Sequence, residues 1–345
     1  MTATPSGRPL LRVSPEEEGM KLARFLERRL GLPGGMIRKW IRTGQTRLNG
    51  RRVGPFALLS AGDAVRLPPF ALPPEGPPPP PDLAAALAGA GLDLAACTKD
   101  LLILRKPGGL ATHPGSRQTD SVTSRLAQAL PGLPFLPAPA HRLDRLTSGL
   151  LLAGRSHRAQ ERLHRAFAGG KGIVKDYLAW AKGTWREEPC LLTDVLRREQ
   201  GADGRERTRA LPGGRTLRPG EILPPPGPGE ARSLVVRAGL LPGRSLLLIR
   251  LLTGRTHQIR VQTASRGFPL LGDGRHGGPP FPLLLLHAWR LRLDADLAGE
   301  TSPGGAFECR ALPDWPPPYA LKEEEAEKAL ARLQAIHPDC AISPG

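Results

Sequence analysis

The chain has 345 residues, of which 40% are hydrophobic, so it is long enough to build packed cores in more than one domain. Its 49 Lys and Arg residues exceed its 32 Asp and Glu residues and give a formal net charge of +17, which favours a polyanion or an anionic membrane as partner. No stretch approaches the roughly 20 consecutive apolar residues of a membrane-spanning helix, so we expect nucleic acid as the partner and no membrane.

The amino terminus and the cysteines predict a cytoplasmic protein. Residues 1–12 lack the apolar core of a signal peptide. The four cysteines, Cys97, Cys190, Cys309 and Cys340, lie far apart and form no Cys-x-x-Cys pair. We therefore expect reduced thiols and no zinc site. No cluster of histidines or spaced carboxylates predicts another metal site.

Residues 13–67 have the pattern of a small module. Apolar residues at helical spacing predict one helix over residues 22–30 and a second over 36–41, separated by a glycine-rich loop at 31–35. Asn49-Gly50 predicts a hairpin turn between a strand at 46–48 and a returning strand at 51–53. A further strand is expected at 64–67.

Basic residues crowd onto the second helix and the hairpin of this module. They are Arg38, Lys39, Arg42, Arg47, Arg51 and Arg52. One interpretation is a solvated basic face; the other is a surface that binds the RNA backbone. The order Ile41-Arg42-Thr43-Gly44, Leu48-Asn49-Gly50 and Gly62-Asp63 resembles an S4 domain. That resemblance implies a small α+β RNA-binding domain over residues 13–67.

Two segments flank the central part of the chain. Residues 68–95 begin with a run of prolines that favours an extended conformation, so we expect a linker there, with a short helical piece at 84–94. Residues 319–345 are expected to form a carboxyl-terminal helix, over 319–336, and a tail. Three glutamates near the start of this helix suit its dipole.

Residues 96–318 alternate short apolar runs with turns. Strands are expected at 101–104, 150–152, 177–181 and 245–252, and helices at 156–167 and 256–265, with Ser156 and Thr256 as their amino-terminal caps. This pattern predicts an α+β domain around a mostly antiparallel sheet. Residues 201–229 are polar and rich in Gly, Pro and Arg, and we expect an insertion loop there.

Asp144 stands in the polar segment His141-Arg142-Leu143-Asp144-Arg145, followed by Thr147-Ser148-Gly149 and an apolar strand. A strand that anchors such a turn could present an active-site carboxylate. Physical reasoning gives equal weight to a structural aspartate that caps the turn and pairs with a neighbouring arginine.

Two further segments could serve a site. In Thr253-Gly254-Arg255-Thr256-His257-Gln258-Ile259-Arg260, a helix start beside arginines could bind a phosphate or a carboxylate, or could be an ordinary basic surface helix. Tyr177, one of only two tyrosines, follows Lys175 and could equally be an ordinary strand residue.

Together these segments resemble the RluA-type pseudouridine synthases. The resemblance covers residues 96–315 and rests on the order of Lys106-Pro107, the Asp144 segment, Lys175…Tyr177, the 253–260 segment, Leu271-Gly272-Asp273 and Leu286-His287-Ala288. It implies an isomerase that converts uridine in RNA to pseudouridine. Because the reaction involves neither redox change nor group transfer, we expect no cofactor.

The resemblance also implies roles by position. Asp144 matches the nucleophile, Tyr177 the tyrosine that stacks on the base, and Arg260 the buried arginine that pairs with the aspartate. Arg142 matches the residue that fills the RNA stack after the target base has left. We expect Arg255 and His257 to contact RNA.

Two positions depart from the family pattern: Gln262 stands in place of a histidine, and His276-Gly277 in place of a Tyr-Gly pair. We expect both to change only local packing. An S4-like module favours large-subunit ribosomal RNA as substrate over transfer RNA. A non-catalytic ribosome-assembly factor is the alternative from another class. We expect a monomer.

Overall fold

The computed structural model describes residues 9–68, 82–115, 118–186, 188–200, 206–211, 213–215, 223–224, 226–298 and 305–338. Most of the proline-rich stretch, much of the 201–229 segment and the tail after residue 338 lie outside the described residues. Within the described part, the strands form one sheet of three and one of twelve.

The amino-terminal unit is the small sheet covered by two helices. Its elements are β1 (Leu10–Arg12), η1 (Pro15–Glu17), α1 (Leu22–Leu30), α2 (Gly34–Arg42), β2 (Arg47–Leu48) and β3 (Ala64–Arg66). Both predicted helices are confirmed, because their apolar residues meet in one core with Val65. The turn at Asn49-Gly50 is also confirmed, with φ of 47° and 78°.

The predicted returning strand at 51–53 is wrong. Arg51 makes only an isolated bridge to Leu48, and β2 pairs instead with β3 in the order β1-β3-β2. The strand β1 starts before residue 13 and was not expected, since three residues give too short a pattern to detect.

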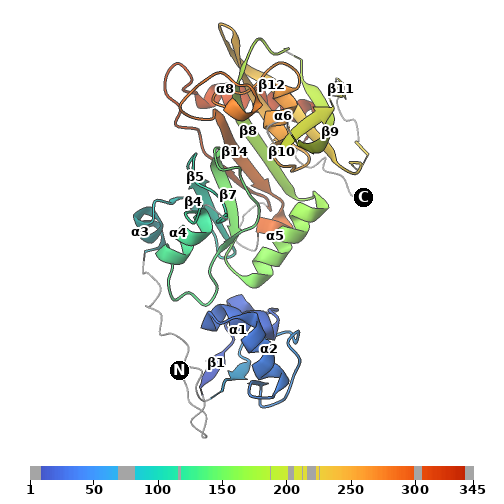
Figure 1. Ribbon diagram of the computed structural model, residues 1–345. Helices are drawn as coiled ribbons and strands as arrows, with labels where there is room; N and C mark the ends of the chain where they lie inside the picture. Colours follow the sequence, from blue (N-terminus) through green and yellow to red (C-terminus); the bar gives the residue numbers. More distant parts are fainter. Residues whose placement is uncertain are drawn as a thin grey trace.

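This unit packs against the rest of the chain. Phe135 belongs by sequence to the larger part but is buried in the core of the small unit. The Arg28 guanidinium lies 3.9 Å from the Phe135 ring centre, and Arg28 Nη2 donates to the Leu136 carbonyl at 2.5 Å. In addition, η1 contacts the long helix α5 (His157–Gly169), beside which the unit lies in Figure 1.

The large sheet runs in the order β10-β9-β12-β13-β8-β14-β7-β5-β4, with β11 on β9, β15 on β14 and β6 on β7. Its strands are β4 (Asp93–Cys97), β5 (Leu101–Lys106), β6 (Ala138–Pro139), β7 (Ser148–Gly154), β8 (Ile173–Lys182), β9 (Cys190–Gln200), β10 (Glu206–Leu211), β11 (Gly214–Arg215), β12 (Glu230–Leu241), β13 (Arg244–Leu251), β14 (Leu286–Leu293) and β15 (Phe307–Arg310). Among these pairs only β14 with β7 is parallel, so the predicted α+β fold with a mostly antiparallel sheet is confirmed.

Helices cover both faces of the large sheet. They are α3 (Leu83–Gly89), α4 (Val122–Ala129), α5, α6 (Gln258–Ala264), η2 (Gly274–His276), α7 (Ala295–Ala298) and α8 (Glu323–Ile336). Ser156 accepts a hydrogen bond from the Ala159 amide, so the predicted cap of α5 is confirmed. The predicted carboxyl-terminal helix is α8, which packs on Trp180 and Trp289 and lies over one face of the sheet in Figure 1.

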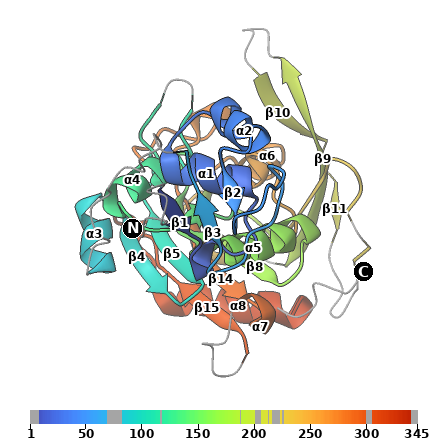
Figure 2. The same cartoon turned by 90° about the horizontal axis from the view of Figure 1, so that it is seen from below.

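The loop expected over 201–229 is partly wrong. Residues 206–211 form β10, which pairs with β9, and 214–215 form β11. Figure 2 shows the β9–β10 hairpin extending away from the body of the molecule. Glycine, proline and arginine obscured the strand pattern, because backbone pairing with β9 rather than apolar alternation holds these residues.

Three of the four cysteines lie among the described residues. Cys97, Cys190 and Cys309 are free thiols, and Cys340 lies outside the described residues. No helix among the described residues is both long enough and apolar enough to cross a membrane.

Candidate active site

Segments identified from the sequence lie side by side on neighbouring strands of the large sheet. Ala288 of β14 pairs with Gly149 of β7 on one side and with Tyr177 of β8 on the other, and Tyr177 pairs with Ile249 of β13. Gly149 has a φ of 111°, and a Cβ there would lie 2.3 Å from the Ala288 carbonyl oxygen. Only glycine therefore lets β7 and β14 approach this closely.

The turn that carries Asp144 is held from beneath by two buried side chains. Lys106 Nζ donates to the carbonyls of Leu110 and Arg145 at 2.8 and 3.2 Å. Burial lowers the pKa of Lys106 to about 8, with Asp144 acting in the opposite direction. The Thr112 hydroxyl donates to the Leu143 carbonyl at 2.9 Å and accepts from the Leu143 amide at 3.1 Å. The carboxylate is thereby presented from a fixed backbone.

Asp144 itself has loose contacts. Arg260 Nη1 lies 3.5 Å and His257 Nε2 lies 3.8 Å from Asp144 Oδ2. The side chain of Asp144 retains 18% of its exposure. The carboxylate thus faces a cation and an imidazole while remaining accessible to a ligand, which a nucleophile requires.

Arg260 pairs with Asp144 as expected but more tightly with Asp273. Arg260 Nε and Nη2 bind the two Asp273 oxygens at 2.8 and 2.6 Å in a bidentate pair. Burial would lower the pKa of Arg260, and the two aspartates raise it. Asp273 fixes the guanidinium that faces Asp144. Sequence analysis noted the Leu-Gly-Asp segment but assigned Asp273 no role.

The helix α6 begins differently from the prediction. Thr256 does not cap it; His257 precedes the helix in the left-handed conformation, with φ 55° and ψ 21°. The Gln258 side-chain oxygen closes the turn instead, accepting from the Arg255 amide at 2.9 Å and from the Thr253 hydroxyl at 2.8 Å. This conformation directs the His257 side chain towards Asp144.

Tyr177 belongs to the same core face as Leu143 and Ile259 and is only 6% exposed. Burial raises the pKa of its hydroxyl, and the charges of Asp144 and Asp176 raise it further. The hydroxyl is therefore protonated at neutral pH. The fold brings Tyr177 and Arg260, two of the predicted catalytic residues, close to the third, Asp144, although the three are spread over more than a hundred positions of the sequence.

The predicted RNA-binding residues fall into two groups. Arg142 and Arg255 are exposed near the site, with Arg255 Nε donating to the Glu230 carbonyl at 3.3 Å. Arg38, Lys39, Arg42 and Arg52 line a hollow of about 710 Å³ on the amino-terminal unit. Arg47 of β2 and Arg51, which follows the Asn49-Gly50 turn, lie outside this lining.

The two departures from the family pattern differ in their surroundings. Gln262 is buried, and its side chain hydrogen-bonds Asp194, Ser233 and the Ala231 carbonyl. His276 makes a polar contact as well as packing: its Nε2 lies 3.2 Å from His257 Nδ1. His257 in turn faces Asp144. Over the described residues, no three His, Cys, Asp or Glu side chains gather as a metal site would require.

Comparisons with known proteins identify the family of the chain. Residues 100–265 match the family described as RNA pseudouridylate synthase. The ribosomal large subunit pseudouridine synthase C of Escherichia coli (strain K12) is 34% identical over 312 residues, covering 88% of this chain and 91% of the relative. The protein of the same name from Haemophilus influenzae is 30% identical over 302 residues, covering 85% of this chain and 89% of the relative.

A solved structure shares the fold. Human RNA Pseudouridylate Synthase Domain Containing 1 superposes with a TM-score of 0.53 at 20% identity, covering 75% of this chain and 99% of that one.

Proposed function

The chain belongs to the RNA pseudouridylate synthase family, and we propose from this that it isomerises uridine to pseudouridine in large-subunit ribosomal RNA, with Asp144 as the nucleophile. The observation that carries the assignment of Asp144 is its position: an accessible carboxylate on a braced turn, 3.5 Å from the Arg260 guanidinium. The names of the relatives support large-subunit ribosomal RNA as the substrate.

The reaction needs an ionised carboxylate and a uracil that can rotate within the site. The N1–C1′ bond of uridine breaks, the uracil rotates, and C5 joins C1′; the proton that leaves C5 is balanced by the one gained at N1. Asp144 attacks as the carboxylate, and the positive charge of Arg260, held in place by Asp273, stabilises that form.

The target base must leave its stack, which costs a few kcal/mol. Arg142, exposed two residues before Asp144, fills the vacated position in the RNA. Tyr177 offers its ring to the uracil, and stacking of this kind contributes roughly 1–3 kcal/mol. Because burial raises the pKa of its hydroxyl, Tyr177 stays protonated and can donate a hydrogen bond to the uracil, but it is not the base that removes the C5 proton.

We extend the proposal to the amino-terminal unit, which binds RNA as an S4-like domain over residues 13–67. The hollow lined by Arg38, Lys39, Arg42 and Arg52 is where phosphates bind. Arg38→Gln with Arg42→Gln should weaken RNA binding and flatten its salt dependence by about one counterion for each charge removed. Unchanged binding would contradict this part of the proposal.

The activity is tested on RNA from a strain that lacks the protein. The purified chain is incubated with ribosomal RNA and, separately, with transfer RNA, and pseudouridines are mapped. We expect product in large-subunit ribosomal RNA and none with Asp144→Ala, which should still bind the RNA. Product only in transfer RNA would overturn the substrate assignment, and product from Asp144→Ala would overturn the nucleophile.

We also propose that the protein acts as a monomer in the cytoplasm. Sedimentation at micromolar concentration should give the mass of a single chain of 37.0 kDa. A dimer mass would contradict this.

A further inference from the structure

His276, His257 and Asp144 form one line of side chains. The His276 and His257 rings meet edge to face, with centroids 5.4 Å apart and planes at 86°. His276 Nε2 lies 3.2 Å from His257 Nδ1, within hydrogen-bonding range. On its other side, His257 Nε2 lies 3.8 Å from Asp144 Oδ2. The line therefore runs from η2 to the candidate nucleophile.

The backbone supports a functional place for His257. A φ of 55° is uncommon for a residue with a Cβ, and such strained residues cluster at functional sites. Gln258 maintains the conformation through its bonds to the Arg255 amide and the Arg232 carbonyl, both at 2.9 Å. The fold thus keeps the His257 ring beside Asp144 in spite of the strain.

Both rings are uncharged at neutral pH. Burial lowers the pKa of His276 to about 4, and burial also lowers the pKa of His257. Asp144 and Asp273 act in the opposite direction, and Arg260 and Arg275 add to the lowering. A neutral imidazole carries one N–H and one acceptor nitrogen, so between His257 Nδ1 and His276 Nε2 one donates and the other accepts.

The two contacts of His257, with Asp144 and with His276, together decide which nitrogen donates. If His257 donated from Nδ1, its Nε2 would direct a lone pair towards the carboxylate, which is repulsive. If His276 donates from Nε2, His257 carries its proton on Nε2 and directs an N–H at Asp144 Oδ2. The second arrangement is favoured by both contacts.

We propose that His276 is a positioning residue that fixes His257 in the Nε2–H tautomer and so directs an uncharged donor at Asp144 Oδ2. The shortest contact of Arg260 with Asp144 is also to Oδ2, which leaves Oδ1 as the oxygen for uridine. The effect of this arrangement on catalysis rests on the proposed function of Asp144, whereas the tautomer of His257 does not. It adds a role for a residue that sequence analysis assigned to packing.

The tautomer can be read directly by NMR of the full chain with nitrogen-15 histidine, assigned with a His257→Gln variant. We expect His257 to be neutral and protonated on Nε2 between pH 8 and pH 7. In His276→Phe, which keeps the bulk but has no donor, His257 should show both tautomers or take up a second proton in this range. His276→Tyr, whose hydroxyl can donate, should resemble the wild type. In Asp144→Asn the preference should weaken.

The outcome that overturns the inference is His257 protonated on Nδ1 in the wild type, or a His276→Phe spectrum identical to it. These readings need no activity, so they stand even if no RNA is modified. If the wild type is active, His276→Phe should lower the single-turnover rate about five- to tenfold without changing the dissociation constant for RNA. His276→Tyr should lose less. Equal losses in both variants would mean that His276 serves only packing.

Discussion

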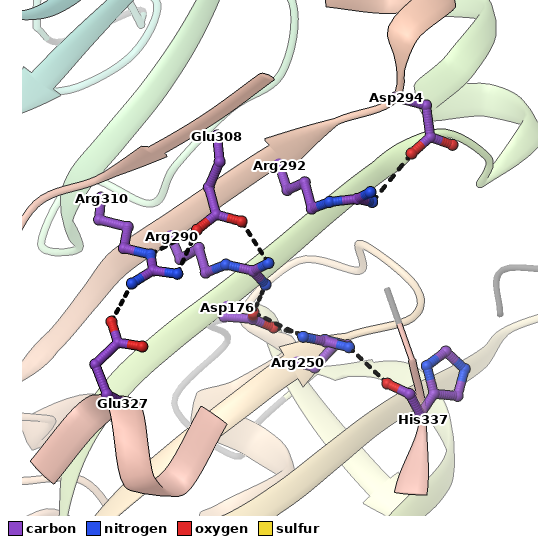
Figure 3. A network of polar contacts seen from close by, with 9 residues as sticks. All are labelled: Asp176, Arg250, Arg290, Arg292, Asp294, Glu308, Arg310, Glu327 and His337. Atoms are coloured by element: carbon purple, nitrogen blue, oxygen red, sulfur yellow. Dashed lines mark hydrogen bonds and ion pairs between the residues drawn. The ribbon is translucent and has the colours of Figure 1, made fainter. Parts of the chain in front are cut away.

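Two aspartates, one on strand β8 and one on the turn before β7, both lie beside arginines, yet their surroundings are opposite. Asp176 on β8 is fully buried and accepts from Arg250 Nε and Nη2 at 2.7 and 2.9 Å and from Arg290 Nη1 at 2.7 Å (Figure 3). Asp144 keeps 18% of its side-chain exposure, and its shortest contacts with Arg260 and His257 are 3.5 and 3.8 Å. One carboxylate is saturated by protein donors; the other is left with capacity for a substrate.

The partners of Asp176 are themselves tied to neighbouring elements. Arg250 donates to the His337 carbonyl at the end of α8, and Arg290 bonds Glu308 of β15 at 2.6 Å. Figure 3 shows the network continuing through Arg310 to Glu327 of α8. The Asp176 cluster therefore links α8 and β15 to the central strands of the sheet. The next residue on β8, Tyr177, faces the candidate site. Adjacent positions on one strand thus serve stability and chemistry separately.

The largest expected effect on stability is at Asp176. Asp176→Ala leaves two buried arginines without their shared anion and should lower the free energy of unfolding by about 3–5 kcal/mol. Urea unfolding at pH 7 measures this, with Asp144→Ala as the matched control, expected to change it by less than about 1 kcal/mol. Equal losses in the two variants would remove the distinction between the clusters.

Arg260 beside Asp144 and Arg250 beside Asp176 should differ in the same way, the first affecting the reaction rate and the second the stability. Arg260→Lys keeps a charge but cannot bind both Asp273 oxygens and face Asp144, because an ammonium lacks the guanidinium fork. We expect the single-turnover rate on ribosomal RNA to fall about tenfold or more, which corresponds to about 1.4 kcal/mol or more in the barrier. The matched variant Arg250→Lys should lower stability while leaving the rate of the folded fraction within about twofold. A normal rate for Arg260→Lys would contradict the role given to Arg260.

The smallest expected effect is in the pH dependence of stability. Burial lowers the pKa of His287 to about 4, below its value in an unfolded chain of about 6.5. The unfolded chain then binds more protons between these values, so stability is complete above pH 6.5 and declines as the pH falls towards 4. The decline from His287 is at most about 1.4 kcal/mol per pH unit. His287→Gln should make the slope of unfolding free energy between pH 6.5 and 5 shallower by up to one proton, and an unchanged slope would rule this out.

Much of the fold followed from local patterns. The spacing of Leu22, Phe25 and Leu26 predicted α1, and Ser156 predicted the start of α5, because the apolar face and the cap are coded within a few residues. The β9–β10 hairpin was missed because its pairing depends on partners along the backbone and not on alternating side chains. Thr256 was expected to cap α6, but the helix has no side-chain cap and begins after His257, whose left-handed conformation has no signature in sequence.

The candidate catalytic residues could be predicted from motifs, but the contacts that support them could not. Asp144, Tyr177 and Arg260 stood out because each belongs to a segment of the family pattern. The bidentate bond of Asp273 to Arg260 and the contact of His276 with His257 join residues 13 and 19 positions apart through η2. Such contacts depend on how the segment 270–278 folds back on α6. The replacement of tyrosine by His276 was the one sequence signal available, and it was interpreted as packing.

The most direct test compares Asp144→Asn with Asp176→Asn in two measurements on the same preparations: urea unfolding and single-turnover pseudouridine formation in large-subunit ribosomal RNA. Asparagine keeps the shape of each side chain and removes its charge. We predict that Asp144→Asn keeps wild-type stability and loses at least about a thousandfold in rate. Asp176→Asn should be destabilised, while its folded fraction retains activity. Pseudouridine formed by Asp144→Asn at a rate close to wild type would contradict the assignment of Asp144 as the nucleophile.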